Sequence, residues 1–374
     1  MKVVHLAQDW RIGGLERVAA TLVLGLRARQ IDVEVWGLSG GGPILERLAQ
    51  AGVVTHVFQH DVYLSLPAIV SVARALKTAA AQIVHTHALP AGVLGRLAAL
   101  AAGARRVHHW HTLPQLRGWT AVKERVLNAC TDRILCCSDA VRRALVDGGW
   151  AAAERCSVVY NGVSAGEHDG SPWQRARVRE RWGLTDDRLV IGTIASLEPH
   201  KGHRVLLDGI PRVLARYPSA IFVWAGEGSQ AADLRARVAA RALEGAVRFL
   251  GRVDDVPAVL SALDLVVMPS TEREGFPVAL TEAAMAGCPA VASRVGGVPE
   301  IIEDRATGLL VPPGNAVALA DAIVELLSSA ELRKQLGEAA RVHARAQFTS
   351  DAMVEQVIAI YRAVLGPSPG LGLP

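Results

Sequence analysis

Residues 269–299 read PSTEREGFPVALTEAAMAGCPAVASRVGGVP, and this stretch decides the fold. The apolar run Leu265–Met268 ends just before it, and a second apolar run, Pro289–Ala292, lies within it. Between the two runs, Pro277 opens a segment with helical composition; proline suits the first helical position because its missing N–H would have no partner there. A strand, a helix and a second strand in this order indicate a unit with parallel strands.

The same alternation of short apolar runs and longer segments with helical spacing continues in both directions. Beyond residue 188 the runs are Leu189–Ile194, Ala220–Trp224, Val247–Leu250, Leu265–Met268, Pro289–Ala292 and Gly308–Val311. Before residue 161 they are Val3–Leu6, Val33–Trp36, Val54–Phe58, Ile83–His85, Val107–His109, Ile134–Cys136 and Ser157–Tyr160. Runs that are apolar on both faces predict parallel sheets covered by helices on each side.

The alternation breaks once, at the turn signal Asn161-Gly162 and the polar segment Ser164–Trp182, which we interpret as a linker. We therefore expect an α/β protein with two Rossmann-like, doubly wound parallel-sheet domains that face each other across a cleft. Ligands of such sheets bind beyond the carboxyl ends of the strands.

The expected N-terminal domain spans residues 1–165. A helix over residues 351–365, which carries Met353, Val357 and Tyr361 on one face, is expected to complete it. The expected C-terminal domain spans residues 166–350, and residues 366–374 form a Pro- and Gly-rich tail that we expect to be flexible.

Composition excludes several classes of protein. Of 374 residues 51% are hydrophobic, which rules out global disorder, yet no apolar run reaches the ~18–20 residues of a spanning helix. The net charge of +4 is diffuse and lacks an interleaved basic and aromatic patch, so we expect no nucleic-acid partner. The five cysteines show no C-x-x-C spacing and fit reduced thiols. The chain start is not that of a signal peptide, and we expect the protein in the cytoplasm.

The loop and helix after residue 268 offer groups for a diphosphate-linked ligand. The free amides of Val278, Ala279 and Leu280 at a helix N-terminus form an anion site with the helix dipole. Glu282, inside that helix, can accept hydrogen bonds from two ribose hydroxyls, and Glu274, eight residues earlier, can meet the sugar end. The alternative is that Glu274 is a solvated loop charge and Glu282 an ordinary acid in the first turns of a helix.

This stretch resembles the donor-binding signature of the retaining GT-B glycosyltransferases called family 4. The matching residues are Glu274-Gly275-Phe276-Pro277, Glu282-Ala283-Ala284-Met285-Ala286-Gly287, Pro289 and Gly296-Gly297-Val298-Pro299-Glu300. The order Ala284-Met285 reverses the commoner one, and Ala290 replaces a valine. The resemblance implies that Glu282 holds the ribose and that Glu274, with the amides of Gly275 and Phe276, contacts hydroxyls of the donor sugar.

Two further segments resemble the same family. Ala195–Gly202 is similar to its G-R-L-x-x-x-K-G element, in which the lysine and arginine grip the diphosphate; Lys201 matches, but Ser196 stands at the arginine position. Arg204, one turn later, is a candidate substitute. The loop after Phe249-Leu250 resembles the segment near the nucleobase, which implies a contact through the backbone of Arg252 and Val253.

In the first half, Gly13 and Gly14 precede a helix at the place where the family lines the donor phosphate and the acceptor. The resemblance also assigns His111 to a contact with the reacting sugar. Two H-x-H pairs, His85 with His87 and His109 with His111, invite a metal site as an alternative, but we expect no metal and no other cofactor.

We therefore expect a retaining, metal-independent glycosyltransferase that moves a sugar from a nucleotide-diphosphate sugar to a saccharide or lipid-linked hydroxyl acceptor, in cell-envelope or exopolysaccharide synthesis. The alternatives are another GT-B enzyme, either a nucleotide-sugar epimerase or a disaccharide phosphorylase, and a non-catalytic scaffold. Leu113–Arg125 mixes Leu116, Trp119 and Val122 with basic residues. Such a segment predicts a peripheral contact with the inner membrane face, with an ordinary surface helix as the alternative.

Overall fold

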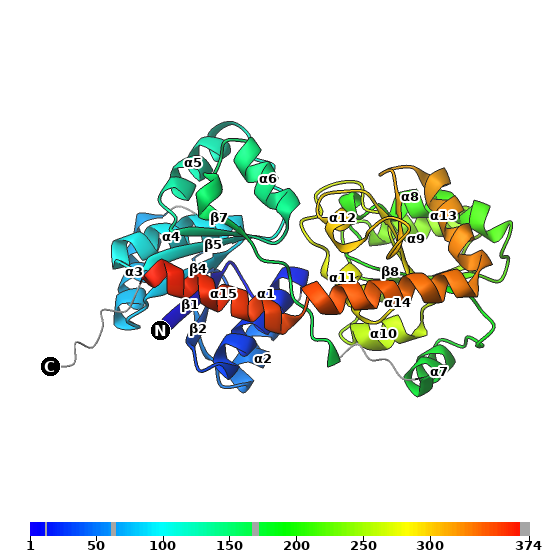
Figure 1. Cartoon of the computed structure of the whole chain (residues 1–374), viewed down its shortest axis with the longest axis horizontal. Helices are drawn as coiled ribbons and strands as arrows, with labels where there is room; N and C mark the ends of the chain where they lie inside the picture. The colour runs from blue at the N-terminus through cyan, green and yellow to red at the C-terminus, as the bar shows by residue number, and fades with distance from the viewer. Residues whose placement is uncertain (12, 61–64, 167–171, 367–374) are drawn as a thin grey trace. The chain divides into compact units, whose positions relative to one another are not determined.

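The computed structural model describes residues 1–11, 13–60, 65–166 and 172–366. These residues form two compact units, whose helices and strands are labelled in Figure 1. Unit 1 comprises Met1–Gly162 and the segment from Ser350 onward, and unit 2 comprises Val163–Thr349. We expected the boundaries after residues 165 and 350, so both lie slightly earlier in the chain. Apart from Gly366, the expected tail lies outside the described residues.

Unit 1 contains a parallel sheet in the order β3-β2-β1-β4-β5-β6-β7. Its strands are β1 (Lys2–Ala7), β2 (Asp32–Gly37), β3 (Val54–Val57), β4 (Ile83–His87), β5 (Arg105–Trp110), β6 (Arg133–Cys136) and β7 (Cys156–Val158). Its helices are α1 (Gly14–Ala28), α2 (Pro43–Gln50), α3 (Leu66–Thr78), α4 (Leu89–Ala102), α5 (Gly118–Ala129), α6 (Asp139–Asp147) and α15 (Ser350–Leu365), with a 3-10 turn at Ala153–Arg155.

Unit 2 contains a second parallel sheet, in the order β10-β9-β8-β11-β12-β13. Its strands are β8 (Val190–Ile194), β9 (Ile221–Ala225), β10 (Val247–Gly251), β11 (Leu265–Met268), β12 (Ala290–Ser293) and β13 (Leu309–Val311). Its helices are α7 (Pro172–Arg181), α8 (His203–Leu214), α9 (Ala231–Ala240), α10 (Val256–Ala262), α11 (Val278–Met285), α12 (Val298–Ile301), α13 (Ala316–Ser328) and α14 (Ala330–Gln347), with a 3-10 turn at Pro199–Lys201.

The strand orders confirm the predicted doubly wound sheets, because every apolar run of the sequence overlaps one strand. In unit 2 the chain moves outward from β8 to β10 and then returns to place β11 on the other side of β8. The boundary between the neighbouring strands β8 and β11 is therefore the topological switch point. Ligands of such sheets bind at the carboxyl ends of the strands at this point. The run that became β3 is an edge strand, and Val54 and Val57 are exposed.

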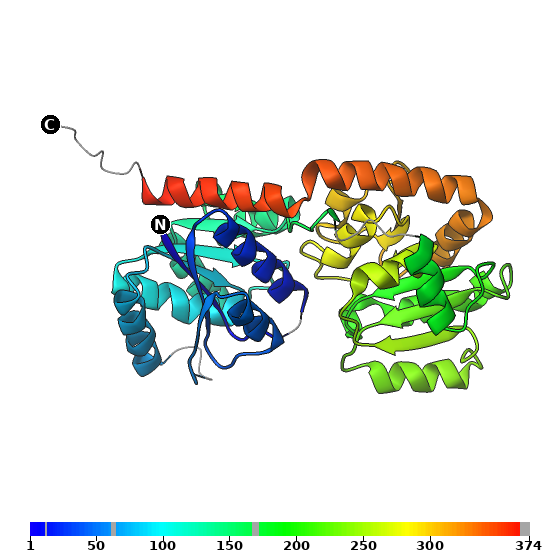
Figure 2. The ribbon, with the colours of Figure 1, turned by 90° about the horizontal axis from the view of Figure 1, so that it is seen from below.

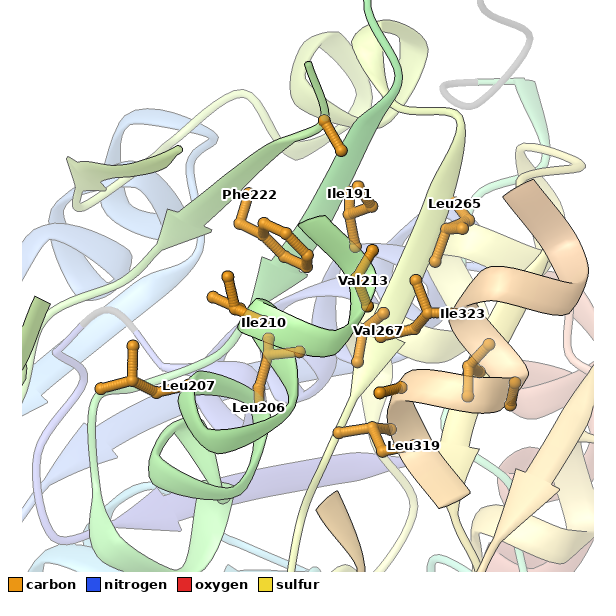
Figure 3. Packing of buried hydrophobic residues seen from close by; sticks show 14 of the residues in the cluster. Ile191, Leu206, Leu207, Ile210, Val213, Phe222, Leu265, Val267, Leu319 and Ile323 are labelled. Atoms are coloured by element: carbon orange, nitrogen blue, oxygen red, sulfur yellow. The ribbon is translucent and has the colours of Figure 1, made fainter. Parts of the chain in front are cut away.

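The core of unit 2 fills the space between its sheet and two helices, α8 and α13 (Figure 3). Side chains from alternate positions of the strands meet those of the helices, as a buried parallel sheet requires. The labelled residues are Ile191, Leu206, Leu207, Ile210, Val213, Phe222, Leu265, Val267, Leu319 and Ile323. Among the described helices of the chain, none combines the length and the apolar composition needed to cross a membrane.

In unit 1, the two faces of the sheet differ in chemistry because neighbouring side chains of a strand point to opposite sides. Val4 and Val84 pack with α3 and α4 in an apolar core. His5 and His85, which are partners in the register of β1 and β4, lie on the other face and contact Tyr361 of α15.

Five buried histidines gather on that face: His5, His85, His87, His109 and His111. Burial disfavours the charged imidazolium and lowers the pKa of His5 and of His111 to about 3. Burial first, and then charge on the neighbouring rings, lowers the pKa values of His85, His87 and His109 well below the ordinary histidine value. All five rings are therefore neutral at neutral pH.

The C-terminal helix α15 is tied to unit 1 along its whole length, beside α1 (Figures 1 and 2). Arg29 of α1 pairs with Asp351 at 2.8 Å and also with Glu355. At the buried side, Met353 accepts a hydrogen bond from the Gly162 amide. The predicted apolar face of this helix is confirmed, because Met353, Val357 and Tyr361 are all buried. The helix therefore brings Tyr361 to the histidine face of the sheet.

The segment interpreted as a linker contains a packed helix, so that interpretation was wrong for α7. Arg179 of α7 is 1% exposed. Its guanidinium donates to the backbone oxygens of Ala262, Thr185, Asp186 and Arg188 and pairs with Asp264 at 2.7 Å. The polar composition hid this helix because, among its described side chains (residues 173–181), the one deeply buried is an arginine. Residues 167–171 of the expected linker lie outside the described residues.

We predict that Arg179→Met lowers the free energy of unfolding of unit 2 by about 3–5 kcal/mol, because several backbone carbonyls lose their guanidinium donor and Asp264 keeps only Arg175 and the Val190 amide of its described partners. The control is Arg177→Met on the same helix, whose guanidinium lies over the exposed ring of Trp173 and contributes less than about 1 kcal/mol. Urea unfolding of the full chain measures both. Equal losses for the two variants would contradict this account of α7.

The neutral histidines predict that unit 1 loses stability in acid. Below about pH 6.5 the unfolded chain binds protons that the folded unit does not, so the free energy of unfolding falls as the pH decreases. Each such ring contributes up to about 1.4 kcal/mol per pH unit. Denaturant unfolding between about pH 7 and pH 5 should show a shallower loss for His5→Gln than for the parent, whereas His56→Gln, at an exposed histidine, should match the parent. Stability that is constant over this range would count against neutral rings.

Candidate functional site

The loops that follow β8, β9, β10 and β11 lie at one edge of the unit 2 sheet, because all these strands are parallel. Backbone hydrogen bonds join them into one surface. The amide of Leu197 donates to the carbonyl of Glu227 at 2.9 Å, and the amide of Gly226 donates to Gly251 at 2.8 Å. On the other side of β8, the amide of Thr271 donates to His200 at 2.8 Å. This set of loops is called the carboxyl edge below.

At the carboxyl edge, Lys201 and Glu274 form an ion pair across the switch point. The Nζ atom of Lys201 lies 2.7 Å from Oε1 of Glu274, and the hydroxyl of Ser270 donates to the same oxygen at 2.6 Å. The Glu274 side chain is 5% exposed and that of Lys201 is 21% exposed. The pair is thus mostly buried, but the ammonium keeps donors for a further partner.

Gly202 allows the two loops of this pair to approach. Its φ of +72° lies in the left-handed region, and a Cβ atom there would overlap the carbonyl oxygen of Pro269 at the end of β11. A side chain would therefore push apart the loops that carry Lys201 and Glu274. This close approach explains why a glycine, Gly202, follows Lys201 in the sequence.

The N-terminus of α11 lies directly after this loop. Pro277 is the N-cap residue rather than the first helical residue that we expected. The Leu280 amide donates to the carbonyl of Pro277 at 3.1 Å, so the expectation of three free amides was wrong at this position. The amides of Val278 and Ala279 precede the first bonded turn, the position from which helix amides can donate to an anion.

Three other residues of the same signature occupy distinct places. Glu282 lies half-buried in α11, one turn from its start. Gly275 is buried, and the Phe276 side chain packs edge-on against Phe348, with ring centres 5.1 Å apart. Phe276 is 3% exposed, and its ring therefore serves the packing of unit 2.

Arg204, the candidate substitute for the arginine missing from the sequence element, makes its ion pair elsewhere in unit 2. Ser196 is exposed at the start of the loop that follows β8. Arg204 pairs with Asp233 of α9 at 3.0 Å, and its guanidinium is half exposed. The described residues therefore place Lys201, and not Arg204, against Glu274.

The residues expected near the nucleobase follow β10. Arg252 is exposed, with its nearest acidic partner Asp254 at 3.9 Å, and Val253 is half-buried. The carbonyl of the preceding Gly251 accepts a hydrogen bond from the Gly226 amide, so this segment belongs to the carboxyl edge.

In unit 1, Gly13 is the N-cap of α1 and Gly14 its first residue, so both lie at the switch point between β1 and β4. The Glu16 carboxylate folds back over Gly13, and a Cβ on that glycine would overlap it. Burial raises the pKa of Glu16. A phosphate at this helix start would have to displace this carboxylate, which favours hydroxyl ligands there.

His111 follows β5 at the corresponding edge of unit 1 and is 9% exposed. Its Nε2 atom lies 3.1 Å from Nδ1 of His87, and within the described part of the chain its Nδ1 atom has no hydrogen-bond partner. The predicted H-x-H pairs do meet: the nitrogens of His87, His109 and His111 lie within 4.8 Å of one another, as do those of His5, His85 and His87. By distance alone, either group could hold a metal ion.

Sequence reasoning missed two residues of these sites. Ser270 binds Glu274, and its signal was its position four residues earlier in a loop. Tyr361 was assigned to an apolar helix face, but its hydroxyl contacts two histidines. A tyrosine on a buried face carries a hydroxyl that needs a partner, and that requirement is the signal that could have found it.

Comparisons with known proteins agree with this geometry. Residues 174–343 match the family described as Glycosyl transferases group 1, and residues 12–167 match the family described as Glycosyltransferase Family 4. A D-inositol 3-phosphate glycosyltransferase of Actinosynnema mirum is 30% identical over 305 residues, which cover 75% of this chain and 72% of the relative.

The alpha-D-kanosaminyltransferase of Streptomyces kanamyceticus is 33% identical over 193 residues, 51% of this chain. The chain spans about half the length of this and other curated relatives that it matches. Among solved structures, HepE of Anabaena in complex with UDP-glucose is similar with a TM-score of 0.87 and 25% identity, over 96% of this chain and 99% of that one. With two doubly wound units that each match one of these families, the chain belongs to the family 4 type of GT-B glycosyltransferases.

Proposed function

We propose that this protein transfers a sugar from a nucleotide-diphosphate sugar to a hydroxyl acceptor with retention of the anomeric configuration. The observation that carries the proposal is the Lys201–Glu274 pair beside the N-terminus of α11. An ammonium and free helix amides suit a diphosphate, and a buried carboxylate suits the hydroxyls of a sugar attached to it. HepE, a similar structure, was solved with UDP-glucose, which supports a nucleotide-sugar donor here.

Each donor-side residue then has a role. The ammonium of Lys201 and the amides of Val278 and Ala279 bind the diphosphate and stabilise the charge that grows on it as the sugar leaves. Glu282 accepts hydrogen bonds from the ribose. The backbone of Arg252 and Val253 contacts the nucleobase.

We further propose that attack and departure occur on the same face of the sugar. The acceptor oxygen bonds to the anomeric carbon, the bond to the diphosphate breaks, and the acceptor proton passes to the departing phosphate oxygen. The hydrogen bonds that Oε1 of Glu274 accepts from Lys201 and Ser270 withdraw charge from the carboxylate and so disfavour a covalent route through it. The ammonium also supplies the positive charge that a metal ion would otherwise provide, so we propose that the transfer needs no metal.

A lipid-linked acceptor is favoured over a free saccharide by the surface of α5 in unit 1. Trp119, Val122 and Val126 are 79%, 52% and 60% exposed, and their spacing puts them on one helix face. Arg117 and Arg125 are exposed beside them. An apolar row between basic side chains suits an anionic membrane surface. Leu116 does not belong to this face, contrary to our expectation, because it is only 7% exposed.

The donor site predicts opposite outcomes for two cations near each other in sequence. Lys201→Met should abolish the rise in melting temperature that UDP or GDP causes in the parent and should lower kcat by about 100-fold or more, because the diphosphate loses its ammonium. Arg204→Met, whose guanidinium pairs with Asp233, should leave both nearly unchanged. Transfer assays in EDTA, with NMR of the product anomer, also test the metal-free and retaining proposals.

The double variant Lys201→Met/Glu274→Gln controls for the buried charge that the single variant leaves unpaired. It should recover stability without recovering diphosphate binding. Full diphosphate binding by Lys201→Met would refute the assignment. Release of an epimerised nucleotide sugar when no acceptor is present would favour the epimerase alternative.

The α5 surface predicts binding to vesicles that contain anionic lipid. The parent chain should float with such vesicles, and the variant with serine at positions 119, 122 and 126 should stay behind. Trp173→Ser, at a tryptophan of α7 that is 68% exposed, is the matched control and should float. Loss of flotation in both variants, or in neither, would argue against α5 as the contact.

A further inference from the structure

A continuous chain of hydrogen bonds runs from α15 to His111 through the sheet of unit 1. The Tyr361 hydroxyl lies 2.5 Å from Nδ1 of His85 and 3.2 Å from Nε2 of His5. Nδ1 of His5 lies 3.0 Å from Nε2 of His87, and Nδ1 of His87 lies 3.1 Å from Nε2 of His111. Four imidazoles and one phenol thus form a single chain, all of it at most 9% exposed.

Such a chain has two proton arrangements in which the hydroxyl proton and every ring proton inside the chain are bonded. A neutral imidazole has one N–H and one bare nitrogen, so each ring must donate to one neighbour and accept from the other. All N–H groups must therefore point the same way along the chain. In one polarity His111 holds its proton on Nε2 and offers a bare Nδ1, and in the other it holds the proton on Nδ1.

The two ends of the hydrogen-bonded chain do not favour one proton arrangement (polarity) over the other. Nε2 of His85 and Nδ1 of His111 are both buried and, among the described residues, have no partner. Each polarity leaves one unpaired N–H at one of these ends and one bare nitrogen at the other. The decision therefore rests on the bonds inside the chain.

The two contacts of the Tyr361 hydroxyl determine the direction of the hydrogen bonds along the chain. A hydroxyl donates over short distances, whereas an N–H group donates over about 2.7–3.2 Å. The 2.5 Å contact to His85 fits donation by the hydroxyl, and the 3.2 Å contact to His5 fits donation from Nε2 of His5 to the phenol oxygen. With the His5 proton on Nε2, the protons of His87 and His111 are also on Nε2.

We propose that Tyr361 is a positioning residue that fixes the proton of His111 on Nε2, so that the bare Nδ1 of His111 accepts a hydrogen bond from a substrate hydroxyl. The step from proton position to substrate rests on the proposed function, in which His111 meets the sugar. An acceptor nitrogen selects a hydroxyl and rejects a phosphate oxygen or a carboxylate, which have no proton to donate. His111 thus contributes to recognition of the sugar and not to binding of the diphosphate.

The electrostatics of the face support a fixed neutral chain. Burial keeps the Tyr361 pKa well above its ordinary value, so the hydroxyl retains its proton. The neutrality of the rings means that the chain holds a proton in place and does not deliver one to the leaving group.

Binding of a divalent metal ion is the competing use of these rings, but both histidine triads lack an acidic or thiolate ligand within the described residues. An ion there would bring two uncompensated charges into a buried place.

The test is a long-range proton–nitrogen NMR spectrum of the full chain labelled with nitrogen-15 in histidine, with His111→Gln used for assignment. In the parent at neutral pH, the His111 proton should be on Nε2. In Tyr361→Phe the His5 N–H loses its acceptor. The direction of the hydrogen bonds from His5 to His111 should therefore reverse, wholly or in part, and the His111 proton should move toward Nδ1. This measurement needs no substrate, so it stands even if the proposed transfer fails.

The matched control is Ile358→Val, a change at a buried position one turn earlier on α15 whose side chain has no hydrogen-bonding group. It should destabilise the docking of the helix and leave the His111 proton on Nε2. Once a donor is known, Tyr361→Phe should lower kcat/KM about tenfold through KM, as expected for one lost hydrogen bond, and Ile358→Val should not.

Three results would overturn the proposal. A parent His111 with its proton on Nδ1 would give the opposite polarity. Identical spectra for the parent and Tyr361→Phe would show that the tyrosine does not set it. A stoichiometric metal in the purified protein, or zinc added at one equivalent that shifts these histidine signals, would assign the face to metal binding.

Discussion

One mostly buried ion pair at the switch point of unit 2 organises the carboxyl edge of that unit. Lys201 and Glu274 come from the loops after β8 and β11, two strands that are neighbours in the sheet. The two residues are 73 positions apart in sequence. Separating the two charges without a replacement would leave one charge buried and unpaired, so the pair holds both loops in place. Ser270 shares the carboxylate and Gly202 allows the approach, so the local sequence serves this single contact.

The two units use the same sheet topology with opposite electrostatics. At the carboxyl edge of unit 2, a charged pair with free donors suits a charged diphosphate. At the corresponding edge of unit 1, neutral rings and the raised pKa of Glu16 suit uncharged hydroxyls. Parallel strands explain why this works: they bring side chains that are distant in sequence to one edge, and the loops alone decide the chemistry.

Much of this could be predicted from the sequence, because buried parallel strands have a strong pattern. Every apolar run overlaps a strand, and Lys201 and Glu274 do meet. The helix α7 was missed because its buried side chain is Arg179, whose partners are mostly backbone carbonyls that no residue pattern encodes. Tyr361 was missed for a related reason: the helical pattern identified its buried face, but the hydroxyl partners lie on strands some 276 and 356 residues away in sequence.

The central claim is that Lys201 binds the diphosphate of a nucleotide sugar while Glu274 holds its sugar. A crystal structure of the chain with a nucleoside diphosphate sugar tests it most directly. The account predicts a phosphate oxygen about 2.7–2.9 Å from Nζ of Lys201, a second at the amides of Val278 and Ala279, and a sugar hydroxyl on Glu274. A diphosphate bound elsewhere, with Lys201 still paired to Glu274 alone, would contradict it.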